Sequence, residues 1–515
     1  MTEQTEREGL RIRALEALGA FALALVWALV VRPGPLSLPY FWDEADVYAP
    51  GARWLADHDM SPTPGHFPDV WSRGHPPLLY LLGAIVFRLF GPGPLVGHAI
   101  TIPFTALALA GTYVLGAELA GSMRGARWVG LGAAMLLATS PLFMSMGAFF
   151  LPEMPLTALT VIALVLATRG HVGRAAVVGV LLVWIKETGV GPPIAIAGGL
   201  FVEAWTKPGV RRENLRDAAR AIGISLVPVL ALAVFFVWQR LNAGYFVFPH
   251  HQALFADRPM ALWNTITVGP SIFLWHGRWI VTVSALLMFV GAARWRQGRS
   301  AHHAGPGRER ASPANGRGRR GEPMKMPRDR TSAAIVLLLL GNAVFFAKMF
   351  WLERYALPVH PGVCVLLVMT IVACAPRAAV WTGALPITAA CVVGLASLHH
   401  TSGAPEHTFA FADVVESHEE AFAWIAEHRS EARVLTTWPL TTELRQPWLG
   451  FVDASLYAIS SDGLDDSPSS EPDLVLADTS SSRLERLRSL ARARGMLLLT
   501  TVTHETAPPL EIWGP

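Results

Sequence analysis

The chain has 515 residues, of which 52% are hydrophobic and only 16% are charged, and its formal net charge is +3. A soluble globular chain carries about 25% charged residues, so this composition excludes an ordinary soluble protein. The three cysteines, Cys364, Cys374 and Cys391, all lie within apolar stretches, and neither a disulfide framework nor a thiolate metal site is expected. The polar segment 1–16 leads into an apolar stretch without a clear small-residue cleavage site, which indicates a retained first helix rather than a removed signal peptide.

Eleven apolar blocks are near the length of about 20 residues that a helix needs to cross the hydrocarbon core of a bilayer. They lie at 15–31, 94–119, 127–149, 154–168, 175–185 with its continuation, 190–205, 221–238, 271–293, 332–350, 357–375 and 378–398. The fifth and sixth blocks are interrupted by Lys186, Glu187 and Gly189. We therefore expect an all-α polytopic membrane protein with about 11 transmembrane helices.

The distribution of Lys and Arg predicts the orientation, because short cytoplasmic loops carry an excess of both. With a cytoplasmic N-terminus, the basic loops 120–127, 169–174, 206–220 and 294–331 all fall on the cytoplasmic side. The segment 294–330 holds eleven Lys and Arg against three acidic residues, is rich in Gly, Pro and Ser, and is expected to be a disordered loop. Its arginines could form a nucleic-acid tail, but an anchor for the topology is favoured, so no nucleic-acid partner is expected.

The tail at 399–515 is different in kind, because it holds eighteen Asp and Glu against eight Lys and Arg. Its pattern predicts helices at 411–428 and 482–494 and strands at 433–437, 473–477 and 496–502. Strands and helices that alternate at this spacing suggest a small α/β domain. The chain is thus expected to divide into a membrane domain, 1–398, and a C-terminal extracytoplasmic α/β domain, 399–515.

The first extracytoplasmic loop, 32–76, carries the densest set of unusual residues. It contains Phe41-Trp42-Asp43-Glu44-Ala45-Asp46, and Arg73-Gly74-His75-Pro76-Pro77-Leu78 follows at its end. Residues 48–58 have helical spacing, and the apolar stretch 78–90 is too short to cross a bilayer at about 1.5 Å per residue. Both are expected to be helices that lie along the membrane or dip into it.

The acidic pair Asp43 and Glu44 has the placement that a general base needs. A carboxylate beside aromatic residues at the edge of the hydrocarbon is partly desolvated and lies within reach of an acceptor hydroxyl group. The alternative is a pair of interfacial acids that are simply hydrated. His75 before two prolines fits a rigid turn equally well.

These residues, taken together with later motifs, resemble the protein O-mannosyltransferase and aminoarabinose-transferase superfamily of GT-C glycosyltransferases. The matching stretches are Asp43-Glu44, His75-Pro76-Pro77-Leu78, Leu151-Pro152-Glu153-Met154-Pro155-Leu156, Lys186 with Gly189, and Arg354-Tyr355-Ala356-Leu357-Pro358. The resemblance covers roughly residues 10–375. Glu153 stands where these families usually have Asp, and Glu187 stands where Gly is more typical; either difference could alter the donor sugar or the acceptor.

The resemblance implies the GT-C fold and an inverting glycosyltransferase, in which an acceptor hydroxyl group attacks the anomeric carbon of a sugar carried on a polyprenyl phosphate. It implies that Asp43 is the base, with Glu44 as its nearest competitor, and that Glu153 is a second acidic residue that holds the acceptor or pairs with Lys186. The phosphate would need positive charge and hydrogen-bond donors. The candidates are Lys186, Arg354, His75 and Arg73, with Tyr355 and Glu187 beside them; ordinary ion pairing of these cations is the alternative.

No metal and no other cofactor is expected. Asp43, Glu153 and His75 could converge on a divalent ion, but the families that the chain resembles do not need such a metal for catalysis. The adjacent His250 and His251 would not face one point, so a surface or lid role is favoured over metal binding.

The expected partners are a polyprenyl-phosphate-linked sugar, a hydroxyl acceptor in a protein, lipid or glycan, and the lipids of the plasma (inner) membrane. The main alternative is a transporter or lipid flippase, because intramembrane charges also suit transport. Transporters tend to show internal repeats with broken helices, and no such repeat is evident in the sequence. A membrane-anchored binding protein with a working tail is a third interpretation, which leaves the first loop unexplained.

Overall fold

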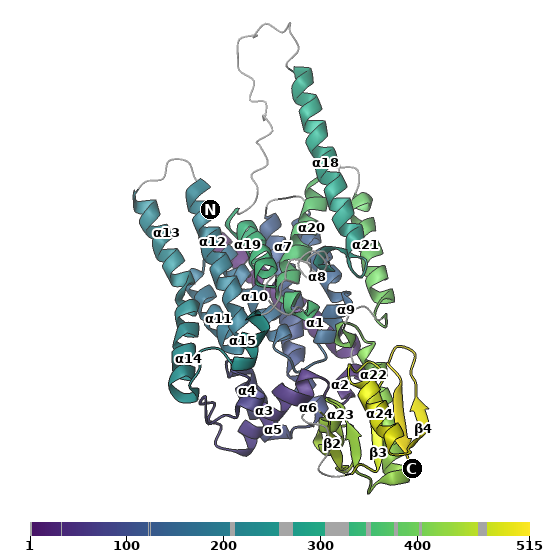
Figure 1. Cartoon of the computed structure of the whole chain (residues 1–515). Coiled ribbons are helices and arrows are strands. Elements are labelled where there is room, and N and C mark those ends of the chain that lie inside the picture. Colours follow the sequence, from purple (N-terminus) through teal and green to yellow (C-terminus); the bar gives the residue numbers. More distant parts are fainter. Residues whose placement is uncertain are drawn as a thin grey trace, which may run out of the picture.

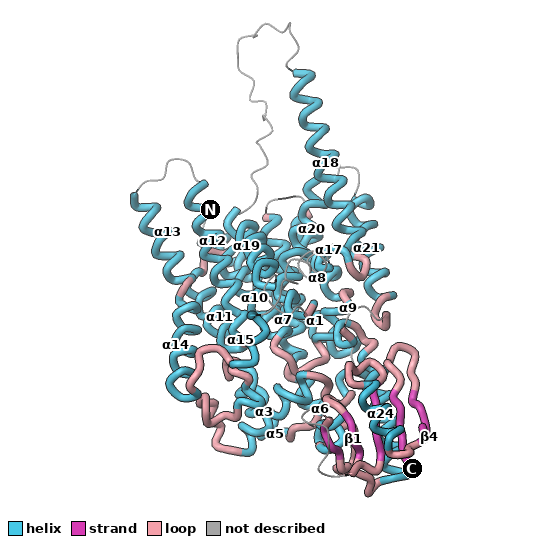
Figure 2. Tube along the Cα trace, in the orientation of Figure 1, coloured by secondary structure: helices cyan, strands magenta, loops and turns pink. Residues whose placement is uncertain are grey.

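A bundle of long helices carries a small α/β domain at one end in the computed structural model of the chain (Figure 1). The structure describes residues 3–31, 33–121, 123, 125–206, 212–256, 271–303, 329–346, 352–374, 380–400, 404–461 and 471–515. Within these ranges every β-strand belongs to the C-terminal domain, as Figure 2 shows.

Each of the eleven apolar blocks contains helix in its described residues. The helices are α1 (Glu3–Val31), α6 (Pro94–Ala99) with α7 (Thr101–Ala120), α8 (Ala126–Ala138) with α9 (Pro141–Met146), α10 (Glu153–Thr168), α11 (Val172–Ile185), α12 (Gly191–Thr206), α13 (Arg212–Ser225) with α14 (Val227–Ala243), α17 (Ser271–Leu274) with α18 (Arg278–His303), α19 (Asp329–Phe346), η3 (Glu353–Val359) with α20 (His360–Cys374), and α21 (Val380–Ala396). Four described stretches are long and apolar enough to cross a membrane, and seven shorter apolar helices accompany them. The chain is a multi-pass membrane protein, as its composition predicts.

Close packing of α7 against α8 depends on glycine. A β-carbon placed on Gly116 would lie 2.8 Å from the Cα of Gly130, closer than real side chains approach. Small residues of this kind let two helix backbones come together in a membrane. Helix α10, which begins at Glu153, also packs against α7.

The first loop and the apolar stretch that follows it form several short helices that lie at the lower end of the bundle in Figure 1. They are α2 (Pro33–Ser37), the π-helix η1 (Glu44–Tyr48), α3 (Ala49–Asp57), α4 (Asp69–Ser72) and α5 (Leu78–Phe90). Helix α5 has the bounds expected from the sequence, and at about 1.5 Å per residue its 13 residues span only about 20 Å. It buries Tyr80 and Phe87 and packs against α3.

The basic segment 294–330 differs in part from its expected disorder. Residues 294–303 continue α18 as helix, and α19 begins at Asp329. Arg and Gln are good helix formers, and adding residues to an existing helix avoids the cost of starting a new one. Residues 304–328 lie outside the described part of the chain, so the disorder expected there stays a prediction.

The C-terminal domain is built on a five-stranded sheet with the order β2-β1-β3-β5-β4. Its elements are η4 (Pro405–His407), α22 (Phe411–Arg429), β1 (Val434–Thr436), α23 (Leu440–Arg445), η5 (Pro447–Leu449), β2 (Ala458–Ser460), β3 (Leu474–Asp478), α24 (Leu484–Ala493), β4 (Leu497–Val502) and β5 (Leu510–Gly514). Strand β1 pairs in parallel with β2 and β3, whereas β5 runs antiparallel to β3 and β4. The expected α/β character is present, and β2 and β5 add to the three expected strands.

Candidate active site

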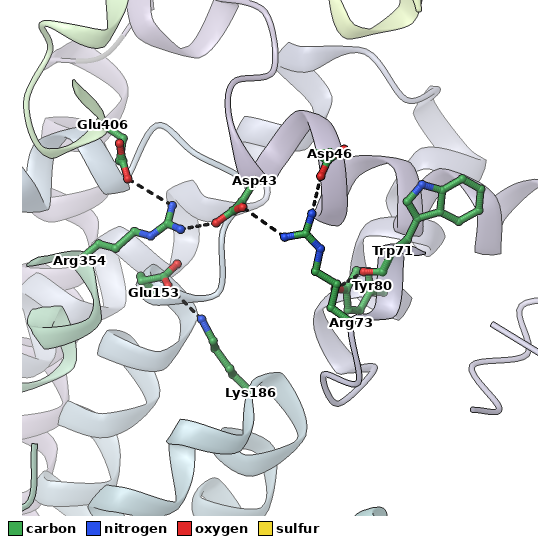
Figure 3. A network of polar contacts seen from close by, with 9 residues as sticks. All are labelled: Asp43, Asp46, Trp71, Arg73, Tyr80, Glu153, Lys186, Arg354 and Glu406. Carbon is green, nitrogen blue, oxygen red and sulfur yellow. Dashed lines mark hydrogen bonds and ion pairs between the residues drawn. The ribbon is translucent and has the colours of Figure 1, made fainter. Parts of the chain in front are cut away.

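Asp43 lies at the centre of a network of charged side chains that Figure 3 shows from close by. The residue directly precedes η1, and its carboxylate accepts a hydrogen bond from Nη2 of Arg354. Its other oxygen lies 3.8 Å from Nη1 of Arg73. The Asp43 side chain is 27% exposed, whereas that of Arg354 is only 4% exposed. The first loop and η3 therefore meet at a carboxylate that solvent still reaches.

The charges around Asp43 decide its ionisation. Burial opposes the charged form and is the largest single effect, but Arg354, together with Arg73, outweighs it and lowers the pKa of Asp43. Asp46 also pairs with Arg73, but its pKa is shifted in the opposite direction. Burial and the nearby charge of Asp43 raise the pKa of Asp46, despite Arg73. The lowered pKa of Asp43 favours its ionised form, which is the form that a general base needs before a reaction.

A second buried ion pair lies beside Asp43. Lys186 directly follows α11 in an extended conformation, and its Nζ lies 3.3 Å from Oε1 of Glu153 at the start of α10. The same Nζ lies 4.7 Å from the centre of the Tyr355 ring, and the Arg354 guanidinium lies 5.5 Å from that ring. Tyr355 thus contacts both cations, and the matched motifs of α10, α11 and η3 converge on the first loop (Figure 3).

His75 and Glu187 form a third pair at the edge of this network. Nδ1 of His75 lies 3.0 Å from Oε2 of Glu187. Burial raises the pKa of Glu187, but the charge and hydrogen bond of His75 outweigh burial and lower this pKa to about 2. The ring of His251 lies 5.0 Å from that of His75, and burial together with His75 lowers the pKa of His251 to about 4. Among the described residues, no group of three His, Cys, Asp or Glu side chains is placed to hold a metal ion.

Glu44 has surroundings unlike those of its neighbour Asp43. Its side chain is fully buried, and its Oε1 accepts a hydrogen bond from the backbone N–H of Phe150 and lies 3.0 Å from Nε2 of His98. Its Oε2 accepts a hydrogen bond from the N–H of Phe41 at 3.3 Å. These contacts tie the first loop to the bundle, which favours a structural role for Glu44.

Two residues of the network were not among the predicted site residues. Asp46 lies three residues after Asp43, so the acidic stretch itself could have indicated it. Glu406 lies in η4, and its Oε1 is 3.7 Å from Nη1 of Arg354. No motif in the sequence connects Glu406 to the first loop. Glu353, the neighbour of Arg354 in sequence, instead lies 3.5 Å from Arg278.

Comparison with solved structures assigns the fold. Two crystal structures of ArnT from Cupriavidus metallidurans, one bound to undecaprenyl phosphate and one in the apo state, match this chain with a TM-score of 0.52 each. The match covers 96% of this chain and 97% of theirs, at 13% and 14% sequence identity. The chain has the GT-C fold. The fold predicted from the motifs is therefore confirmed.

The match to ArnT is visible only in three dimensions. No protein-family model matches the chain, and no curated protein sequence matches it. At this low identity the likeness establishes the arrangement of helices and says nothing of individual residues. The roles of Asp43, Arg354 and Lys186 must be argued from the geometry of this chain.

Proposed function

We propose that the chain is an inverting glycosyltransferase that moves a sugar from a polyprenyl phosphate to a hydroxyl acceptor at the extracytoplasmic face of the membrane. The observation that carries this proposal is the partly exposed Asp43 carboxylate between two arginines, next to the Lys186–Glu153 pair. The fold is shared with a transferase whose crystal structure holds undecaprenyl phosphate, which supports a polyprenyl-phosphate carrier here.

In the proposed reaction, Asp43 acts as the base and several cations stabilise the leaving phosphate. The acceptor hydroxyl group gives its proton to the Asp43 carboxylate while its oxygen forms a bond to the anomeric carbon. On the opposite face of the sugar, the bond from the anomeric carbon to the phosphate oxygen breaks, and the polyprenyl phosphate leaves with both bonding electrons. The proton thus ends on Asp43, and the added negative charge ends on the phosphate.

The cations would stabilise the charge that develops on the leaving phosphate. Arg354 suits a phosphate because its planar guanidinium offers two parallel donors, whereas Lys186 supplies a point charge. Arg73 and His75 lie on the first loop and would contribute at the edge of the site. A phosphate that shares Arg354 with Asp43 weakens the hold of Arg354 on the carboxylate. The pKa of Asp43 then rises, and the carboxylate becomes a stronger base once the donor has bound.

The positions of the basic residues and of the first-loop helices support an orientation for the site. The first-loop helices and the C-terminal domain lie at the lower end of the bundle in Figure 1, opposite the far end of α18. That end of α18 carries Arg294, Arg296 and Arg299, as expected on the cytoplasmic side. This arrangement supports a site at the extracytoplasmic face, where a lipid carrier rather than a cytoplasmic nucleotide sugar would supply the donor.

A transfer assay tests the function directly. Membranes that contain the protein would be incubated with a panel of polyprenyl-phosphate sugars, radiolabelled in the sugar. We expect label from one donor to enter a product that no longer carries polyprenyl phosphate, with equimolar release of the lipid phosphate. Intact labelled donor that crosses the bilayer without any transfer would instead indicate a transporter or flippase.

A further inference from the structure

The segment that opens the C-terminal domain lies against the helix bundle. Within it, η4 places Glu406 next to α9, where the hydroxyl group of Ser145 donates hydrogen bonds to the carbonyls of Glu406 at 2.6 Å and Thr408 at 3.2 Å. Ser145, Glu406 and Thr408 are all buried. The backbone of this segment is therefore fixed to the bundle by contacts that do not involve the Glu406 carboxylate.

The Glu406 side chain turns toward the active site. It is 3% exposed, and its Oε1 lies 3.7 Å from Nη1 of Arg354, while Nη2 of Arg354 donates to Asp43. Figure 3 shows the guanidinium between the two carboxylates. One arginine on η3 thus links the first loop to the start of the C-terminal domain. Because a guanidinium is planar and rigid, a second anchor fixes its direction as well as its position.

The C-terminal domain also holds the residues that precede Asp43. The N–H of Tyr40 donates to the carbonyl of Leu449 at 2.9 Å, and the Phe41 ring stacks with that of Phe411 at 6.1 Å. The rings of Trp42 and Trp438 pack in a T-shaped arrangement with their centroids 5.2 Å apart. The C-terminal domain therefore makes two kinds of contact near Asp43. It touches the residues of the first loop just before Asp43, and through Glu406 it touches Arg354, which pairs with Asp43.

We propose that Glu406 is a positioning residue of the transfer site, through which the C-terminal domain sets the direction of Arg354 and so of the Asp43 carboxylate. This inference rests on the proposed function. Glu406 lies across Arg354 from Asp43, so it acts through the arginine and not on the acceptor. Its effect falls mainly on kcat, because a misdirected base weakens the transition state more than it weakens donor binding.

A double-mutant cycle tests the proposal. The variants are Glu406→Gln, which keeps the side-chain shape, Arg354→Lys, which keeps the charge but loses the two-pronged guanidinium, and the two combined. We expect Glu406→Gln to lower kcat about tenfold with donor KM nearly unchanged, and to lower it less than about twofold further in the Arg354→Lys background. Glu427→Gln, an exposed position on α22, is the matched control and should retain full activity.

The outcomes separate the inference from the proposed function. A wild-type protein that transfers no sugar contradicts the function itself. Wild-type transfer with an unchanged kcat in Glu406→Gln, or with losses that multiply fully in the double variant, overturns the positioning role. If Glu406→Gln fails to fold, Glu406→Asp keeps the charge, and its retreat by one methylene should still lower kcat in a way that disappears in the Arg354→Lys background.

Discussion

The buried pair of Lys186 and Glu153 allows a quantitative test of the site's construction. Replacement of Lys186 by Met keeps the length of the side chain but leaves the Glu153 carboxylate without its cation. The two side chains are 9% and 3% exposed, and their charged atoms are 3.3 Å apart. At an effective dielectric constant of about 20, two unit charges at this distance attract each other by about 5 kcal/mol. We expect Lys186→Met to lower the free energy of unfolding by about 3–5 kcal/mol, as for other broken buried pairs.

The matched control is the variant in which Glu153 is replaced as well. Lys186→Met with Glu153→Gln has no buried charge left to compensate, so it should recover about 2 kcal/mol or more of the loss. The free energies would be measured by reversible unfolding of the purified protein in mixed detergent micelles, followed by tryptophan fluorescence. A loss below about 1 kcal/mol for Lys186→Met would refute the pairing. So would a double variant whose loss of stability equals the sum of the losses measured for Lys186→Met and Glu153→Gln separately.

The remaining predictions concern pH and topology. The pKa of Glu187 is lowered from 4.5 to about 2 in the folded protein, so its pairing with His75 stabilises the fold above about pH 4.5, and this contribution is lost as the pH falls toward 2. Melting temperatures measured across this window should fall less steeply for Glu187→Gln than for the wild type, and equal slopes would contradict the pairing. A reporter enzyme fused after Pro515 should be active only outside the cytoplasm, and cytoplasmic activity would overturn the orientation.

Much of the fold could be predicted because membrane helices follow directly from apolar length. The expected blocks all contain helix, and α5 has its expected bounds because proline and glycine flank a short apolar run. Strands β2 and β5 were not predicted. They have three and five residues, the same lengths as the predicted strands β1 and β3, so length alone does not explain why they were missed. Their place in the sheet depends on pairing with β1 and β3, which are distant in sequence.

The candidate site could be predicted in its motifs but not in its contacts. The sequence predicts that Asp43, Lys186 and Arg354 lie on one face of the membrane, and in the structure they lie close together. Asp43 and Glu44 directly follow Trp42, which has a φ of 52°. Large side chains rarely adopt this left-handed conformation, so the sequence does not indicate it. Glu406 reaches Arg354 only because the C-terminal domain docks on the bundle, which no local pattern encodes.

The central claim is that Asp43 is the base of a sugar transfer, and one substitution tests it most directly. Asp43→Asn keeps the shape of the side chain but cannot accept the proton, so transfer from the preferred polyprenyl-phosphate sugar should fall at least about 100-fold. Expression and membrane insertion should match the wild type. Asp59→Asn, at an exposed position on the same loop, is the matched control and should retain full activity. Full transfer by Asp43→Asn would contradict the claim.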